Sequence, residues 1–220
     1  MTIELHGYSG STYTLTLIHT LKEMGIPFEL IQPAKFEDIK TEEYLATKHP
    51  FGKIPVLIDD GFRIYESRAI ARYLVNKYQG TKNSTILIPK DVEKAALVDQ
   101  FISVEESYYT DPIKKLVYQL VFSKRRGGSP DPEVIKQARE DTNKVLDVYE
   151  KLLEGKDYLA GEFSLADILH IPYTQYAINA GQDDLFNNPN RPNVSRWWKN
   201  ISERENWKQT ISEHKLFSSE

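Results

Sequence analysis

The sequence predicts a small α/β domain followed by an all-helical domain. Short strand and helix patterns alternate as far as Tyr78, whereas only helical spacing of apolar residues is found from Asp91 onward. The stretch between them is polar, with an isolated Ile-Leu-Ile anchor and a proline, which suits a linker. We therefore expect an N-terminal domain over 1–79, a linker over 80–90 and a helical domain over 91–220.

The first elements follow from local signals. Thr2 to His6 alternates enough to be a short strand, and the glycine-flanked residues 7–10 form a turn. Ser11 or Thr12 can then cap a helix, and Gly25 is suited to end it.

The remaining elements of the first domain complete its layer. Residues 27–31 predict a strand and 41–47 a short helix capped by Thr41. Residues 49–70 predict a loop that ends at a proline, two short strands joined by a turn, and a helix that begins at Glu66 and Ser67. The succession is that of a thioredoxin-like α/β domain.

The second half predicts helices separated by one clear exposed loop at 124–132, which holds a Gly-Gly pair and two prolines. The expected helices span about 91–123 with a kink at Pro112, 131–153, 165–179, and 194–211 with a break near 203–205.

Composition excludes several classes of function. Net charge is −4 with both signs interleaved, so we expect no nucleic-acid partner. The chain has no cysteine, which excludes disulfides, thiolate metal sites and a cysteine nucleophile, and its five histidines lack metal-ligand spacing. No window approaches the roughly 18 apolar residues of a membrane span, and the start reads directly as a strand, so we expect a cytoplasmic protein without a metal or a membrane partner.

Ser11 is the first candidate for chemistry because it lies directly after the first strand and turn, at a helix start. A hydroxyl there can donate to an anion bound at the helix N-terminus. The alternative is that it serves only as the helix cap, and Thr12 competes for either role.

The second candidate site combines Lys53, the Ile54-Pro55 corner and the helix start at Glu66 and Ser67. Because proline cannot donate to a strand ladder, neighbouring backbone is free to pair with another chain. The helix start offers an acceptor for an ammonium and donors for a carboxylate. These are the three requirements of a γ-glutamyl peptide, although a carboxylate at a helix start can also simply complement the dipole.

Four further residues are candidates to line an apolar pocket for a second substrate. They are Thr12, Phe36, Tyr108 and Ile113.

The order of these features resembles the glutathione transferases, and among them the phi class of plants and fungi. The resemblance covers nearly the whole chain and is carried by Gly7 to Ser11, Leu21-Lys22-Glu23-Met24-Gly25, His49-Pro50-Phe51-Gly52-Lys53-Ile54-Pro55, Glu66-Ser67-Arg68-Ala69-Ile70 with Tyr73 and Tyr78, Tyr118-Gln119-Leu120, and Phe163-Ser164-Leu165-Ala166-Asp167.

The resemblance implies a role for each matching residue. The serine at Ser11 would donate to the glutathione sulfur and stabilise its thiolate. Lys53 and the backbone of Ile54, next to a cis Pro55, would hold the tripeptide. Glu66 and Ser67 would take the ammonium and carboxylate of the γ-glutamyl end.

One departure from the family concerns the glycine end of glutathione. Phi enzymes commonly carry a His-Lys pair there, and the matching positions are Ile39 and Lys40. Lys40 would supply that positive charge alone.

The resemblance implies an enzyme that conjugates its co-substrate glutathione to apolar electrophiles, acting as a homodimer. Reduction of organic hydroperoxides would use the same thiolate. Two alternatives remain open: a carrier of hydrophobic small molecules with little catalysis, and a non-catalytic interaction protein.

Overall fold

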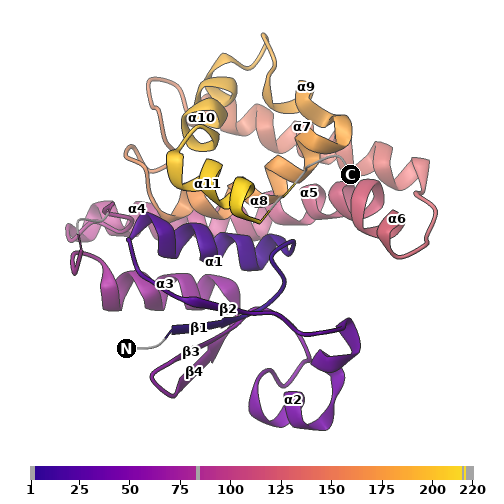
Figure 1. The fold of residues 1–220 in the computed structure, drawn as a ribbon. Coiled ribbons are helices and arrows are strands. Elements are labelled where there is room, and N and C mark those ends of the chain that lie inside the picture. The colour runs from indigo at the N-terminus through magenta and orange to yellow at the C-terminus, as the bar shows by residue number, and fades with distance from the viewer. Residues whose placement is uncertain (1–2, 83–84, 215, 217–220) are drawn as a thin grey trace. The chain divides into compact units, whose positions relative to one another are not determined.

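The structure, a computed structural model, describes residues 3–82, 85–214 and 216 and divides into two compact units (Figure 1). The first contains the chain up to Leu87 and the C-terminal segment from Glu205 onward, and the second contains Ile88–Arg204. The boundaries 1–79, 80–90 and 91–220 stay a prediction for independently folding domains.

A four-stranded mixed sheet forms the centre of the first unit, which confirms the thioredoxin-like fold class. Its strands are β1 (Ile3–His6), β2 (Glu29–Ile31), β3 (Val56–Asp59) and β4 (Phe62–Tyr65), in the order β2-β1-β3-β4. Strands β1 and β2 are parallel, and the other two pairs are antiparallel. Thr2, expected to open the first strand, lies outside the described residues.

The helices of this unit are α1 (Thr12–Glu23), a 3₁₀ helix (Phe36–Lys40), α2 (Glu42–Thr47), α3 (Ser67–Tyr78) and α11 (Glu205–Glu213). Helices α1 and α3 pack side by side next to the sheet (Figure 1). As predicted, Thr41 caps α2, and α1 stops before Gly25, which has a φ of +65°.

The last helix packs on the first one. The Trp207 ring of α11 is fully buried and lies 5.4 Å from the His19 ring of α1, and Lys22 pairs with Glu213 at 2.5 Å. This contact explains why the segment from Glu205 groups with the N-terminal unit rather than with the helices before it.

The second unit is entirely helical over its described residues. Its elements are α4 (Val92–Val104), α5 (Thr110–Val117), α6 (Ser123–Arg125), α7 (Pro132–Leu152), α8 (Leu165–Ala177), α9 (Asp183–Phe186) and α10 (Pro192–Ser202), with π-helical turns at Glu105–Tyr109, Tyr118–Phe122 and Ile178–Gln182.

The kink expected at Pro112 stays a prediction: α5 contains Pro112, and the π-helical segment Glu105–Tyr109 directly precedes it. A proline ring clashes with the carbonyl four residues earlier, which here belongs to Tyr108 inside the wider turn. The break expected near 203–205 is confirmed, since α10 ends at Ser202 and α11 begins at Glu205.

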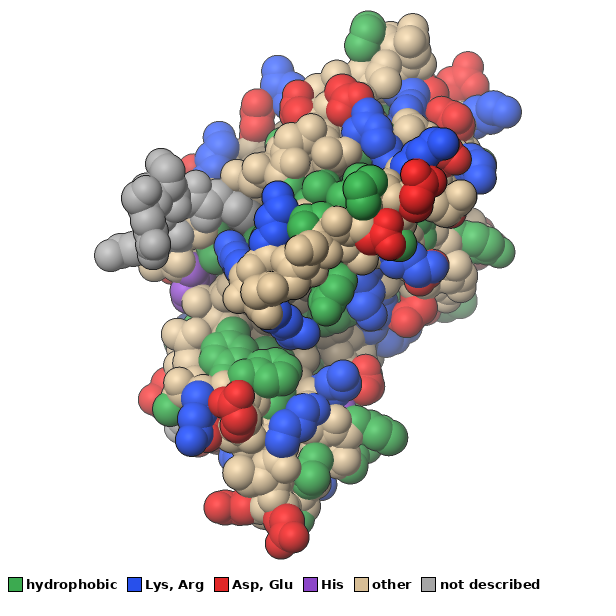
Figure 2. Space-filling model, turned by 90° about the vertical axis from the view of Figure 1, so that its right-hand side faces the viewer, with side chains coloured by type: hydrophobic (Ala, Val, Ile, Leu, Met, Phe, Trp, Pro, Cys, Tyr) green, Lys and Arg blue, Asp and Glu red, His purple; other side chains and the backbone are tan. Residues whose placement is uncertain are grey.

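Charge is spread rather than gathered on the one face that Figure 2 shows. On the face shown in Figure 2, Lys and Arg side chains are interspersed with Asp and Glu. Within the described residues, no helix is both long and apolar enough to span a bilayer.

Candidate active site

The register of the sheet brings the predicted site residues to one end of it. His6 at the end of β1 pairs with Val56 at the start of β3, and Val56 also pairs with Tyr65 at the end of β4. The Ser11 turn follows β1, the Ile54-Pro55 corner precedes β3, and Glu66 follows β4. Because these three segments leave the sheet at the same end, they share one edge of the N-terminal unit.

Ser11 is the N-cap of α1. Its backbone is extended, with φ −82° and ψ 127°, and its hydroxyl oxygen accepts the Thr14 N–H at 3.5 Å. Among the described residues this hydroxyl donates no hydrogen bond. A hydroxyl has one donor and two acceptor positions, so the cap leaves its proton available to an anion. The capping and the chemical interpretations of Ser11 are therefore compatible.

The turn before Ser11 depends on Gly7. A Cβ at that position would lie 2.5 Å from the Thr14 Oγ1, so any side chain would push the turn away from the start of α1. Thr12, by contrast, is buried and lies in the first turn of the helix.

The corner at residues 49–55 is held from two sides. The Lys40 ammonium donates to the Gly52 carbonyl at 2.5 Å, and the Tyr44 hydroxyl donates to the Lys53 carbonyl at 2.9 Å. The Ile54-Pro55 peptide bond is cis, and Ile54 lies outside both ladders, which begin at Val56. The hydrogen bonds from Lys40 and Tyr44 thus hold the corner, while the Ile54 backbone lies beside the sheet rather than within it.

Helix α3 begins without a side-chain cap. Glu66 stands at its N-cap position with φ +72° and ψ 111°, and its side chain is 69% exposed. Ser67 is buried in the first turn. The first N–H groups of α3 and the positive end of its dipole are therefore available to a carboxylate, next to an exposed carboxylate that can bind an ammonium.

Three residues of this edge have features that sequence reasoning missed. His49 faces Glu66, with 3.8 Å between its Nε2 and the Glu66 Oε1. Burial raises the pKa of Tyr44 to about 12, and the neighbouring Tyr8 adds to this. The Tyr8 hydroxyl is buried with no partner among the described residues. Their proximity depends on how the strands register, which no local pattern reveals.

The predicted pocket residues belong to both units. Phe36 opens the 3₁₀ helix and is 48% exposed, whereas Tyr108 lies in a π-helical turn and is 64% exposed. Ile113 is fully buried in α5. Their role, with that of Thr12, stays a prediction.

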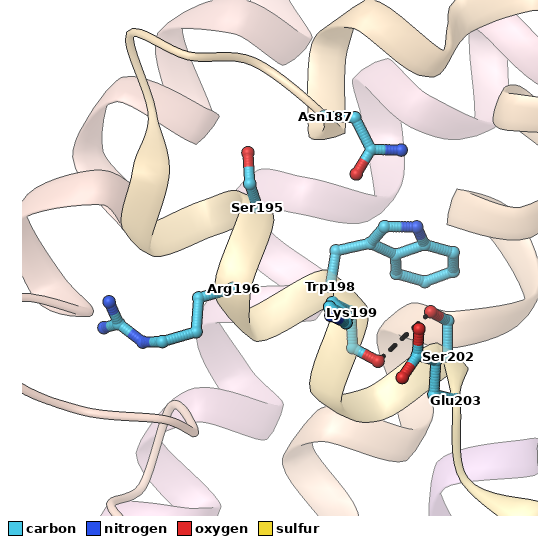
Figure 3. A pocket seen from close by; sticks show the side chains of 7 residues that line it. All are labelled: Asn187, Ser195, Arg196, Trp198, Lys199, Ser202 and Glu203. Atoms are coloured by element: carbon cyan, nitrogen blue, oxygen red, sulfur yellow. Dashed lines mark hydrogen bonds between the residues drawn. The ribbon is translucent and has the colours of Figure 1, made fainter.

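A cavity in the helical unit is unrelated to these residues. It has a volume of about 490 Å³ and is lined by Asn187, Ser195, Arg196, Trp198, Lys199, Ser202 and Glu203 (Figure 3). Its Ser195 hydroxyl donates to the Phe186 carbonyl at 2.8 Å, and the Arg196 guanidinium donates to the Leu153 and Lys156 carbonyls. These polar groups hold α10 in place, and we assign them no catalytic part.

The described residues contain no group of three or more His, Asp or Glu side chains suited to a metal ion. The arrangement that remains is a hydroxyl at one helix start, an open backbone corner, and a carboxylate at a second helix start. All three lie at the same end of the sheet.

Comparison with known proteins identifies the family. Residues 5–82 match the family model of the glutathione S-transferase N-terminal domain, and residues 109–205 match that of the C-terminal domain. Glutathione S-transferase F10 of Arabidopsis thaliana is 40% identical over 200 residues, which is 90% of this chain and 91% of that protein. The chain belongs to the glutathione transferase family and resembles its phi class.

Solved structures agree with this assignment. Glutathione transferase F7 of Populus trichocarpa has a TM-score of 0.90 at 36% identity, covering 96% of this chain and 98% of its own. Glutathione S-transferase I of maize, solved in complex with an atrazine glutathione conjugate, has a TM-score of 0.87 at 31% identity, covering 99% of this chain and 100% of its own.

Proposed function

We propose that this enzyme transfers glutathione, as its thiolate, to apolar electrophiles, with Ser11 as the residue that stabilises the thiolate. The observation that carries the proposal is the convergence of Ser11, the Ile54-Pro55 corner and Glu66 at one end of the sheet. Family membership favours this activity over the carrier alternative.

The magnitudes suit the chemistry. A free thiol has a pKa of about 8.5 and is only a few per cent thiolate at neutral pH. A hydrogen bond to a charged group contributes about 1.5–3 kcal/mol, and a helix N-terminus adds up to about 1 kcal/mol. Since each pKa unit corresponds to about 1.4 kcal/mol, Ser11 at the start of α1 can lower the thiol pKa by roughly one to three units. The thiolate then becomes abundant at neutral pH.

The rest of the tripeptide has a complementary group at each position. Glu66 is proposed to take the γ-glutamyl ammonium, and the open start of α3 at Ser67 takes the adjoining carboxylate. The Ile54 backbone pairs with the cysteinyl residue. Lys53, which is exposed, holds the tripeptide beside Ile54, and the exposed Lys40 attracts the glycine carboxylate. The Lys40 ammonium has three hydrogens and uses one on Gly52, so two are left for a ligand.

The same thiolate can attack the terminal oxygen of an organic hydroperoxide. That step releases the alcohol and forms glutathione sulfenic acid, which a second glutathione converts to the disulfide and water. Conjugation and hydroperoxide reduction therefore share the proposed site.

We include a homodimeric state and a cytoplasmic location in the proposal because the family resemblance favours both. The Phe51 ring, 70% exposed beside the corner, is available to a partner. Size-exclusion chromatography with light scattering tests the dimer, and a fluorescent fusion tests the location.

The experiment that tests the activity compares wild type with Ser11→Ala and Ser11→Thr. With a generic aryl halide, we expect a fall in kcat/KM of about tenfold or more for Ser11→Ala and partial retention for Ser11→Thr, because one charge-assisted hydrogen bond is worth that much. Ultraviolet titration of bound glutathione should show a raised thiol pKa in Ser11→Ala. An unchanged rate and titration in that variant would remove Ser11 from the proposed role.

A further inference from the structure

His49 is a buried imidazole whose two nitrogens have different environments. Its Nδ1 accepts the Phe51 N–H at 3.2 Å. A neutral ring that accepts at Nδ1 carries its proton on Nε2. That Nε2 is the atom that faces the Glu66 Oε1, at 3.8 Å.

The surroundings fix the orientation of the ring. The Tyr65 ring packs against it with 4.6 Å between centroids, and the Phe51 ring meets it edge-on at 6.1 Å. The backbone N–H of His49 donates to the Tyr44 carbonyl at 3.1 Å. Since Tyr65 is bonded to Glu66, the imidazole and the carboxylate are kept close by both the ring contact with Tyr65 and chain connectivity.

Glu66 needs such support. A φ of +72° is rarely adopted by a residue with a side chain and costs about 1–3 kcal/mol. Its carboxylate makes no capping hydrogen bond to α3. Among the described residues, His49 is the one group recorded within ion-pair distance of that carboxylate.

We propose that neutral His49 is a positioning residue for Glu66: its Nε2–H directs the Glu66 carboxylate towards the γ-glutamyl ammonium of glutathione. The inference deepens the proposed function and rests on it.

Protonation of His49 would undo this arrangement in two ways. An imidazolium would pair with Glu66 and compete with the ligand ammonium, and its Nδ1 could no longer accept from Phe51. Burial lowers the pKa of His49, Lys40 and Lys53 lower it further, and Glu66 opposes them. The neutral form is therefore favoured at neutral pH, and glutathione affinity should fall on acidification below the ordinary histidine pKa of about 6.5.

The effect must be reciprocal. A ligand ammonium bound at Glu66 disfavours the imidazolium, so binding releases part of a proton, and affinity can fall at most tenfold per pH unit. Couplings of this kind typically change affinity from about fivefold upward. We expect the Kd to rise about fivefold between roughly pH 7.5 and pH 5.5.

The test measures binding of S-methylglutathione by calorimetry across this pH range. Its thioether does not titrate, so a pH dependence cannot come from the thiol. Wild type is compared with His49→Gln, whose amide keeps a donor near the Nε2 position without titrating, and His49→Asn, which keeps an acceptor for Phe51 but does not reach Glu66. We expect a pH-dependent Kd for wild type, a flat curve for His49→Gln, and a flat but weaker curve for His49→Asn.

A second ligand tests whether the pH dependence requires the ligand's ammonium group. The analogue of S-methylglutathione with a glutaryl group in place of the γ-glutamyl group lacks the amine, and its affinity should change with neither pH nor His49→Gln. Nitrogen NMR of wild type gives an independent measurement, because the inference requires the Nε2–H tautomer.

The outcomes separate the two proposals. A Kd of wild type that does not change with pH, the same slope in His49→Gln, or the Nδ1–H tautomer would overturn the role of His49 while leaving the transferase intact. Absence of S-methylglutathione binding by folded wild type at every pH would overturn the proposed function as well.

Discussion

Asp59 connects the sheet to α3 through three hydrogen bonds. This carboxylate ends β3, is 1% exposed, and accepts from the Tyr73 hydroxyl at 2.6 Å, the Tyr78 hydroxyl at 2.7 Å and the Lys77 ammonium at 2.7 Å. Burial alone would raise the pKa of Asp59, but the bonds from Lys77, Tyr73 and Tyr78 outweigh it and lower the pKa. Asp59→Asn should therefore weaken the attachment of α3 to the sheet.

The size of the destabilisation follows from the weaker accepting capacity of asparagine. Its amide nitrogen cannot accept a hydrogen bond, and its oxygen is uncharged. A hydrogen bond to a charged group contributes about 1.5–3 kcal/mol, whereas a neutral one contributes about 1 kcal/mol. Loss of about 1 kcal/mol at each hydroxyl, with a smaller part from the partly exposed Lys77, gives a destabilisation of about 2–3 kcal/mol. For a chain of this size each kcal/mol lowers Tm by about 2–4 °C. We expect a fall of about 4–12 °C at neutral pH.

The pH dependence has a definite sign. Because the pKa of Asp59 is lower in the folded than in the unfolded state, its stabilisation is complete above the unfolded value of about 3.9 and is lost as pH falls through the folded value. The difference in Tm between wild type and Asp59→Asn should shrink as the pH falls below about 4.

Thermal unfolding followed by circular dichroism measures both effects. Asp111→Asn is the matched control, because Asp111 also contacts a lysine, Lys115, at 2.6 Å, but is 68% exposed. Exposed pairs of this kind contribute about 0.3–0.5 kcal/mol. Equal Tm values for the two variants, or a difference that persists in acid, would refute the reasoning.

Two further predictions concern the site. Lys40→Gln should raise the KM for glutathione about threefold to tenfold with kcat unchanged, because the glycine end is bound equally in the ground and transition states. Steady-state kinetics measures both constants, and a fall in kcat alone would contradict the prediction. Gly7→Ala should lower both Tm and kcat because its methyl group would meet the Thr14 Oγ1. The double variant Gly7→Ala/Thr14→Ala should restore part of both quantities, and Thr14→Ala alone is the control. Strict additivity of the two single changes would be evidence against the clash.

Local chemistry was sufficient to predict the elements that carry the site. Ser11 follows a glycine-flanked turn and precedes an apolar helix, and the structure makes it the cap of α1. Glu66 and Ser67 follow a short strand and open a helix, as expected. Such signals depend on residues within one turn of each other, so they are readable from sequence.

Other features depended on tertiary packing. The 3₁₀ helix Phe36–Lys40 was missed because five residues show no helical period. The packing of α11 on α1 is set by Trp207 and His19, which are far apart in the chain. The facing of His49 and Glu66 requires β3 and β4 to pair in one register. This last contact arises only once the strands are aligned.

The lone lysine at the proposed glycine end has a compensating feature in the structure. Fixing a lysine side chain costs up to about 2 kcal/mol of rotamer entropy, which a ligand normally has to overcome when it binds. The Lys40 ammonium is already held on the Gly52 carbonyl, and a Cβ at Gly52 would lie 3.0 Å from that ammonium and 2.7 Å from the Ile39 carbonyl oxygen. Gly52 thus permits the approach that orders Lys40 before a ligand arrives. A single preordered charge can therefore offset much of what a second donor would contribute, which is why Lys40→Gln should affect KM more than the exposure of Lys40 suggests.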